Sequence, residues 1–316
     1  MKKILITGSN GLLGQKLVYN LIKRSDVQVI ATSFGANRLV KKEDYTYESL
    51  DITNKAEVER IFTKYKPDVV INTAAMTNVD ACETKRDECW ALNVTAVQNI
   101  IDAITLITSP STNGKENSPH LIHLSTDFIF DGKKGSEYLE TDVPNPQSYY
   151  AESKLESEKI VQKSKIKWAI ARTIIIYGIV DNMSRTNIVL WAKDALTKGQ
   201  KINVVDDQFR SPTLAEDLAD GCILIADKGA TGIYHLSGQE TMSILELVYK
   251  VADYFKLDKS LITPSKSDTL NQAAKRPPFT GFIIDKAKHD LGYNPHSFMA
   301  GLEILDRQLK ELKAGV

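Results

Sequence analysis

Tyr150 and Lys154, a tyrosine and a lysine four residues apart, are the residues of this sequence best suited to acid–base chemistry. Residues i and i+4 lie on one face of a helix, so the ammonium group would sit beside the phenol. We expect Lys154 to lower the pKa of Tyr150 toward neutrality, because a nearby positive charge favours the phenolate. The phenol could then exchange a proton with a carbonyl or alcohol oxygen, to which the Thr126 hydroxyl could also hydrogen-bond. The alternative is an ordinary helix start on the surface, and this spacing alone does not decide between them.

The elements that must position these residues begin with a glycine turn near the start of the chain. An apolar, β-rich run over residues 3–7 stops at the turn, and a helical apolar pattern over residues 12–23 follows it. In such a strand–turn–helix unit, glycines let the backbone approach a pyrophosphate, and the helix N-terminus offers free N–H groups to it. We therefore predict a dinucleotide site here, a tight turn without a ligand being the alternative. Its predicted residues are Gly8, Asn10, Gly11, Leu12 and Gly14.

The residues after the second predicted strand, 27–32, bear on which dinucleotide is bound. An acidic residue there would bind the ribose 2′-hydroxyl of NAD, whereas Arg38 with Ser33 suits a 2′-phosphate. We therefore expect NADPH as cofactor and leave NADH open, because Arg38 could equally belong to a solvated loop. Asp51 and Ile52 end the next strand and are also predicted at the cofactor. Asp51 would bind the adenine amino group or, alternatively, share in capping the following helix.

Strands alternate with helices over the first 180 residues. This order predicts an α/β fold, a doubly wound, Rossmann-like parallel sheet with a smaller, discontinuous C-terminal lobe. Ligands of such sheets bind at the carboxyl ends of the strands, where Gly8, Ala74, Ala75 and Thr126 all fall. We predict a dinucleotide-binding domain formed by residues 1–180 plus about 206–237, and a substrate lobe formed by about 181–205 plus 238–316.

Composition restricts the expected partners and compartment. Lys+Arg and Asp+Glu both number 40 among 316 residues, so no net charge attracts nucleic acid or a charged membrane surface. Three cysteines without paired-motif spacing suit a reducing compartment. The apolar run before Gly8 is too short for a signal peptide or a membrane span. We expect a cytoplasmic protein that binds no nucleic acid or membrane and has no metal-binding residues in its site. A homodimer is possible, and the sequence leaves open both the oligomeric state and a metal ion at an interface.

Several motifs resemble those of the extended short-chain dehydrogenase/reductases over essentially the whole chain. They are the glycine turn, the segment 72–75, Asn93, and the set of Thr126, Tyr150 and Lys154. Within that superfamily, the dTDP-4-dehydrorhamnose reductases are the most similar. Three segments resemble their S-T-D-Y-V-F, D-Q-x-G-x-P-T and R-P motifs, namely residues 125–132, 207–213 and 276–277.

This resemblance implies an NADPH-dependent oxidoreductase that reduces the C4 ketone of a nucleotide-linked 4-keto-6-deoxy sugar, in that group dTDP-4-dehydrorhamnose to dTDP-rhamnose. It implies that Tyr150 donates the proton, that Lys154 holds the cofactor ribose, and that Thr126 hydrogen-bonds the carbonyl oxygen. A nucleotide sugar also carries a pyrophosphate, which Arg side chains bind well. The residues that this reading adds are Asn93, Ala74 and Ala75 for the cofactor, and Asp127, Arg210 and Arg276 for the substrate.

The chain departs from the reductase pattern in three places. Arg210 replaces a usual glycine, residues 276–282 lack the Asn-Ser of R-P-x-N-S-x-L, and the polar stretch 108–118, predicted as a surface loop, is extra. The same pattern also resembles the regulatory β subunit of methionine adenosyltransferase, so a cofactor-binding regulatory subunit is the alternative function. Another reductase or an epimerase of the superfamily is a third. Phe128 stands where the related 4,6-dehydratases carry Glu, which counts against a dehydratase.

Overall fold

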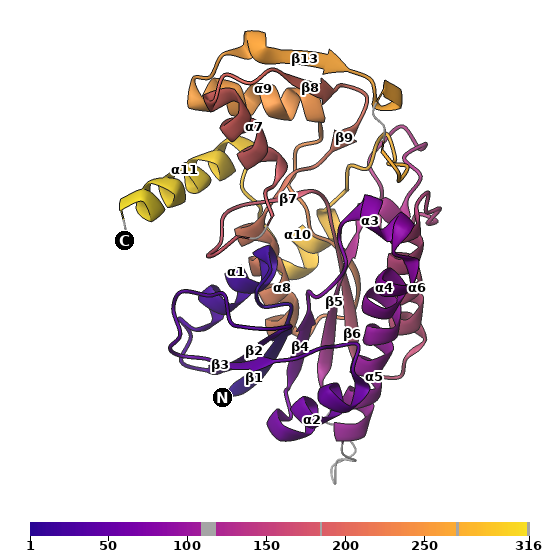
Figure 1. The fold of residues 1–316 in the computed structure, drawn as a ribbon. Helices are drawn as coiled ribbons and strands as arrows, with labels where there is room; N and C mark the ends of the chain where they lie inside the picture. Colours follow the sequence, from indigo (N-terminus) through magenta and orange to yellow (C-terminus); the bar gives the residue numbers. More distant parts are fainter. Residues whose placement is uncertain (109–117, 184, 270–271, 315–316) are drawn as a thin grey trace.

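The structure is a computed structural model that describes residues 1–108, 118–183, 185–269 and 272–314. A seven-stranded sheet forms its centre, with the order β11-β6-β5-β4-β1-β2-β3 and parallel pairing throughout (Figure 1). This arrangement confirms the predicted doubly wound α/β fold, whereas most of the predicted loop 108–118 lies outside the described residues. The strands are β1 (Lys2–Thr7), β2 (Val27–Ser33), β3 (Thr46–Ser49), β4 (Val69–Asn72), β5 (His120–Thr126), β6 (Trp168–Thr173) and β11 (Gly232–His235).

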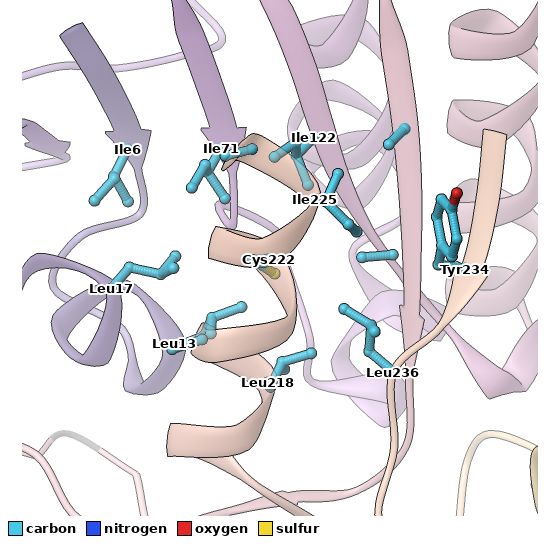
Figure 2. Close-up of a cluster of buried hydrophobic side chains, with 14 of the residues drawn as sticks. Ile6, Leu13, Leu17, Ile71, Ile122, Leu218, Cys222, Ile225, Tyr234 and Leu236 are labelled. Atoms are coloured by element: carbon cyan, nitrogen blue, oxygen red, sulfur yellow. The ribbon is translucent and has the colours of Figure 1, made fainter. Parts of the chain in front are cut away.

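Helices cover both faces of this sheet because its strands are apolar on both sides. Along β1, Ile4 and Ile6 join one core cluster and Leu5 joins another, as the alternation of side chains in a strand requires. The first cluster lies under α1 (Leu12–Leu21) and α8 (Ala215–Lys228), and Figure 2 shows their apolar side chains meeting those of the strands. The second lies under α2 (Lys55–Tyr65), α5 (Ala96–Ile107) and α6 (Tyr149–Lys163).

The C-terminal lobe has a separate core and sits beyond one end of the sheet (Figure 1). Its main elements are α7 (Ile188–Thr197), β8 (Ile202–Val205), α9 (Ile244–Phe255), β13 (Ile262–Ser265) and α11 (Phe298–Ala314). Short elements complete the described chain: α3 (Val79–Thr84), α4 (Arg86–Trp90), the π-helical η1 (Ala91–Thr95), η2 (Asp127–Ile129), β7 (Ile176–Tyr177), β9 (Phe209–Arg210), β10 (Thr213–Leu214), β12 (Met242–Ser243), η3 (Lys259–Leu261), η4 (Ser267–Thr269) and α10 (Asp285–Leu291).

The predicted division of the chain differs from the packing in two segments. Residues 206–210 were assigned to the dinucleotide-binding domain but pair with the lobe, because β9 forms an antiparallel pair with β12 and the Asp206 N–H donates to the Ser265 carbonyl. Helix α10 packs against α8 and β11 of the central sheet, and the apolar residues around it belong to the core under α1 and α8. Residues 282–293 therefore pack with the dinucleotide-binding domain and not with the lobe to which the sequence assigned them. The physical reason is that these apolar side chains cover a face of α8 that would otherwise be exposed; they are Phe282, Ile284, Ala287, Leu291 and Tyr293.

One helical stretch within the described residues, Arg86–Ile107, is long and apolar enough to meet the length and composition of a membrane span. It comprises α4, η1 and α5, and half of its most apolar part is buried inside this fold. Helix α5 packs against α2 and α6, which is the environment of a core helix.

Candidate active site

Two adjoining cavities lie at the carboxyl ends of the central strands. The larger, of about 690 Å³, has Thr126, Tyr150 and Lys154 in its wall. The smaller, of about 360 Å³, is lined by residues that follow β1, β2, β3 and β4. The structure thus places every predicted site residue except Asn93 in one of these walls. The larger holds Leu12, Gly14, Asp127, Arg210 and Arg276 as well, the smaller holds Gly8, Ser33, Arg38, Asp51, Ile52 and Ala74, and both share Asn10, Gly11 and Ala75.

The glycine turn between β1 and α1 leaves no room for side chains. Gly8 has a φ of +69°, and a Cβ atom there would lie 2.8 Å from the backbone nitrogen of Ala74. A Cβ atom on Gly14 would lie 2.3 Å from the Gly8 carbonyl oxygen. Helix α1 starts after Gly11 without a side-chain cap, so its first N–H groups stay available to a ligand. This bare backbone at a helix N-terminus fits the pyrophosphate of a dinucleotide.

Replacing Gly14 by alanine should test this close approach. The added methyl group would clash with backbone atoms, which cannot move aside as a flexible side chain could, so we expect a loss of about 1–3 kcal/mol in the free energy of unfolding. NADPH binding should weaken as well. Gly11→Ala is the matched control for stability, because its Cβ would meet its nearest atom at 3.2 Å and should cost less. Equal unfolding midpoints for the two variants in urea would contradict this expectation.

Asn10 and Asp51 contact the chain around the smaller cavity. The Asn10 side chain donates to the Ala36 carbonyl at 2.9 Å and accepts from the Arg38 N–H at 2.9 Å, so it fixes the loop that carries Arg38. The Asp51 carboxylate accepts from the Thr53 N–H at 2.9 Å. Asp51 does not cap the next helix, because the capping residue of α2 is Asn54.

Tyr150 and Lys154 lie in the first two turns of α6, which the Ser148 side chain caps. Both residues are buried, with Tyr150 only 9% exposed, and the Tyr150 ring packs edge-on against Phe128. The Lys154 ammonium donates to the Leu124 carbonyl oxygen at 2.6 Å. The predicted helical face is therefore present and turned into the larger cavity.

Burial reverses the predicted pKa shift of Tyr150. Removal from water raises the pKa of the phenol above its usual range, and the Asp127 carboxylate raises it further, while the Thr126 hydroxyl opposes this. The expectation that Lys154 lowers the pKa of Tyr150 toward neutrality is therefore wrong for the protein alone. Burial also lowers the pKa of Lys154, to about 8, because the charged form is poorly solvated there.

Asn93 lies outside both cavity walls, so the structure does not support it as a direct cofactor ligand. It is buried within the π-helical turn η1, a type of turn often found near functional sites. Its amide accepts from the Met76 N–H at 2.7 Å and donates to the Ser153 hydroxyl at 3.0 Å. Asn93 thus joins the chain after β4 to the helix that carries Tyr150 and Lys154.

Beneath Lys154, a buried polar chain crosses from β1 to α6, and we did not expect it from the sequence. Thr7 bonds Asn72 at 2.5 Å, and Asn72 contacts a His123 ring nitrogen at 3.1 Å. The other ring nitrogen lies 2.9 Å from the Ser157 hydroxyl and 3.4 Å from the Lys154 ammonium. Burial lowers the pKa of His123 far below its usual value, so the imidazole is neutral. Nothing in the sequence distinguishes His123 from a core histidine in an apolar strand.

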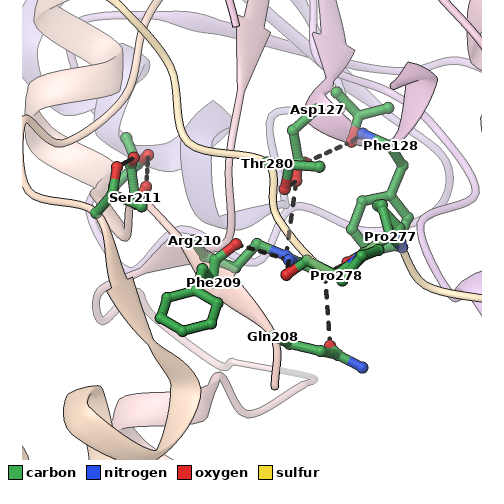
Figure 3. A network of polar contacts seen from close by, with 12 residues as sticks. Asp127, Phe128, Gln208, Phe209, Arg210, Ser211, Pro277, Pro278 and Thr280 are labelled. Carbon is green, nitrogen blue, oxygen red and sulfur yellow. Dashed lines mark hydrogen bonds and ion pairs between the residues drawn. The ribbon is translucent and has the colours of Figure 1, made fainter. Parts of the chain in front are cut away.

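The three predicted substrate residues differ in what their side chains contact. The Asp127 carboxylate accepts from the Thr126 hydroxyl at 3.0 Å and from the Thr280 hydroxyl. Arg210 is buried, and its guanidinium donates to backbone carbonyls, which corrects the expectation that it offers those groups to a pyrophosphate (Figure 3). Arg276 is half-buried and pairs with Asp80 at 2.7 Å.

Together, the glycine turn, the parallel sheet and the buried Thr–Tyr–Lys cavity define a nucleotide-binding protein of the short-chain dehydrogenase/reductase type. Residues 1–310 match the family model described as RmlD substrate binding domain, and the chain belongs to this family. It is 32% identical over 317 residues to a dTDP-4-dehydrorhamnose reductase of Aggregatibacter actinomycetemcomitans, an alignment that covers 96% of this chain and 98% of that one.

Two further comparisons bear on function. The chain is 29% identical over 281 residues to the methionine adenosyltransferase 2 subunit beta of Xenopus tropicalis, with 87% of this chain and 78% of that one covered. The structure is similar to that of a dTDP-4-dehydrorhamnose reductase from Bacillus anthracis in complex with NADP, with a TM-score of 0.79 and 27% identity over 98% of this chain and 100% of that one. The NADP complex of this reductase supports a nicotinamide cofactor.

Proposed function

We propose that this protein is an NADPH-dependent reductase of the C4 ketone of a nucleotide-linked 4-keto-6-deoxy sugar, with dTDP-4-dehydrorhamnose as the expected substrate and dTDP-rhamnose as the product. One observation carries the proposal: Thr126, Tyr150 and Lys154 line the same cavity as Gly11 and Gly14 of the glycine turn. The similarity to reductases of this substrate supports the same assignment.

Each of the three residues then has a defined task. A bound nicotinamide cofactor supplies the hydride. Tyr150 donates its proton to the oxygen of the reacting carbonyl, and the raised pKa of its phenol keeps that proton in place until the oxygen becomes basic. The Lys154 ammonium can turn from the Leu124 carbonyl toward the hydroxyls of a bound ribose. Thr126 sits in the same wall, and its hydroxyl, which donates to Asp127 in this structure, can turn to donate its proton to the substrate oxygen.

The direct test is consumption of NADPH with enzymatically prepared dTDP-4-dehydrorhamnose, with NADH in a parallel assay. We expect turnover with NADPH and formation of dTDP-rhamnose. Binding of NADPH without turnover of any 4-keto sugar nucleotide would contradict the proposal.

Replacing Arg38 by alanine should reveal the choice between NADPH and NADH. Arg38 is exposed in the wall of the smaller cavity, where its guanidinium can bind a 2′-phosphate. We expect the KM for NADPH to rise about tenfold or more, since hydrogen bonds between charged groups contribute about 1.5–3 kcal/mol, and the KM for NADH to stay unchanged. Lys41→Ala is the matched control, because Lys41 is paired with Asp44 nearby and lies outside both walls. Equal effects of Arg38→Ala on both cofactors would rule out phosphate recognition.

A cofactor-binding regulatory subunit is the second candidate, because the methionine adenosyltransferase 2 subunit beta of Xenopus tropicalis is similar over most of this chain. A regulatory role does not require Thr126, Tyr150 and Lys154 to share one cavity, and this favours the reductase. NADPH binding without turnover, together with a stable complex with a methionine adenosyltransferase catalytic subunit, would support the regulatory role. An epimerase, in contrast, would retain tightly bound NAD after purification.

A further inference from the structure

Arg210 has a buried guanidinium that binds two separate segments of the chain (Figure 3). One terminal nitrogen donates to the Phe209 carbonyl oxygen at 2.7 Å, and the other donates to the Pro277 carbonyl oxygen at 2.7 Å. A longer contact reaches the Pro278 carbonyl at 3.3 Å. The Arg210 side chain therefore adds bonds between β9 and the segment 277–280 that a glycine at this position would lack.

The segment 277–280 is held closely between β9 and the loop that follows β5. The Phe209 N–H donates to the Pro278 carbonyl at 2.7 Å, and the Thr280 N–H donates to the Phe209 carbonyl at 3.2 Å. On the other side, a Cβ atom on Gly132 would lie 2.8 Å from the Phe279 nitrogen. The Thr280 hydroxyl in turn donates to the Asp127 carboxylate, so the segment reaches the active-site cavity through Asp127.

Asp127 is the point where these contacts converge. Asp127 as a residue is 2% exposed, and its carboxylate accepts from Thr126 and Thr280 and lies 3.7 Å from the Arg210 Nε atom. A buried carboxylate is costly unless hydrogen bonds and a positive charge compensate it. Burial raises the pKa of Asp127, and Arg210 is the largest influence that opposes this rise. Among the described residues, the Tyr150 phenol also faces Asp127, and the Arg276 charge lowers the pKa of Arg210.

The orientation of the Thr126 hydroxyl depends on Asp127. A threonine hydroxyl has one proton to donate and two lone pairs that accept. Thr126 donates its proton to Asp127 at 3.0 Å and accepts from the Phe128 N–H at 3.2 Å. A change in the charge or position of the carboxylate would therefore turn the hydroxyl that shares the cavity wall with Tyr150.

We propose that Arg210 is a positioning residue for Thr126. Arg210 contacts both Asp127 and the carbonyl groups of residues 277 and 278. The orientation of the Thr126 hydroxyl, which donates to Asp127, therefore depends on the position of the segment 277–280. This inference rests on the reductase function proposed above. Arg210, which stands where the reductases usually carry glycine, then has a role in the chemical step rather than in pyrophosphate binding.

The test is Arg210→Gly, which leaves a space the size of a guanidinium ion. We expect kcat to fall by about tenfold or more, as for loss of one member of a coupled network, while the KM for NADPH stays within about twofold. Added guanidinium chloride, at concentrations well below those that unfold the protein, should restore part of kcat, whereas urea should not because it lacks the charge. Arg210→Lys, which keeps the charge but not the planar fork, should lose less activity than Arg210→Gly. An unchanged kcat, or equal responses to guanidinium and urea, would overturn the proposal.

A double-mutant cycle with Asp127→Asn provides a second readout. If Arg210 acts through Asp127, the kcat of the double variant should be no lower than that of the slower single variant. A kcat loss in the double variant equal to the product of the two single losses would show that Arg210 does not act through Asp127. Arg172→Gly is the matched control, because Arg172 is equally buried and pairs with Glu158 at 2.8 Å outside the cavity wall. Arg172→Gly should lower Tm, and guanidinium chloride should restore its kcat no more than urea does.

The same cycle measured by thermal unfolding separates this inference from the proposed function. If the wild-type protein turns over no sugar nucleotide, the reductase assignment fails, and the coupling between Arg210 and Asp127 is then decided by Tm alone. Tm losses in the two single variants that do not add in the double variant support the link between the two residues. Additive losses overturn it.

Discussion

Replacing Tyr150 by phenylalanine should reduce the kcat of sugar-nucleotide reduction by about 10²–10⁴-fold, the usual contribution of a positioned general acid. The change removes only the hydroxyl group that donates the proton. The ring would keep its packing against Phe128 and against the buried Cys82 and Cys89, so the fold should be unaffected. Steady-state NADPH consumption measures the loss, and circular dichroism with Tm verifies the fold.

Tyr149→Phe is the matched control for this variant. Tyr149 precedes Tyr150 on the same helix, but its ring packs near Trp90 and beneath the Arg86 guanidinium, outside the cavity wall. It should retain close to full activity. Near-full activity of a correctly folded Tyr150→Phe variant would refute the role of Tyr150 as proton donor.

Lys154→Met should lower kcat/KM for NADPH by about 10²–10³-fold, the loss expected when a preorganised charged donor is removed. Methionine keeps most of the side-chain length but cannot donate a hydrogen bond to the cofactor ribose.

The variant also tests a pH dependence. In the free protein the pKa of Lys154 is lowered to about 8, so the ammonium form is present below this pH and is lost as the pH rises through it.

We therefore expect kcat/KM for NADPH in the wild-type protein to be constant below about pH 8 and to fall about tenfold per pH unit above it. Lys154→Met should abolish this basic limb as well as lower the plateau. Lys159→Met is the control, because Lys159 lies on the same helix but is exposed and paired with Glu156. Persistence of the basic limb in Lys154→Met would show that another group is responsible for it.

The sequence by itself determined the sheet, the glycine turn and the helical face that carries Tyr150 and Lys154. These features follow from local rules. Continuous apolar runs of a few residues form strands that are buried on both faces, glycines permit close backbone approach, and a spacing of four residues aligns side chains on a helix. Because the carboxyl ends of parallel strands meet at one edge, Gly8, Ala75 and Thr126 came together as expected.

Only the tertiary structure decided the pKa values of the site residues and the hydrogen-bond partners of their side chains. The pKa of Tyr150 rises because its surroundings exclude water, an effect that outweighs the spacing to Lys154. Asn93 and Arg210 both donate to backbone carbonyls of other segments, and this occupies donors that we had assigned to ligands. Residues 282–293 join the central core because α8 presents an apolar face to them. Burial and the choice of partner depend on residues far apart in the sequence, and the spacing of side chains along the chain does not specify them.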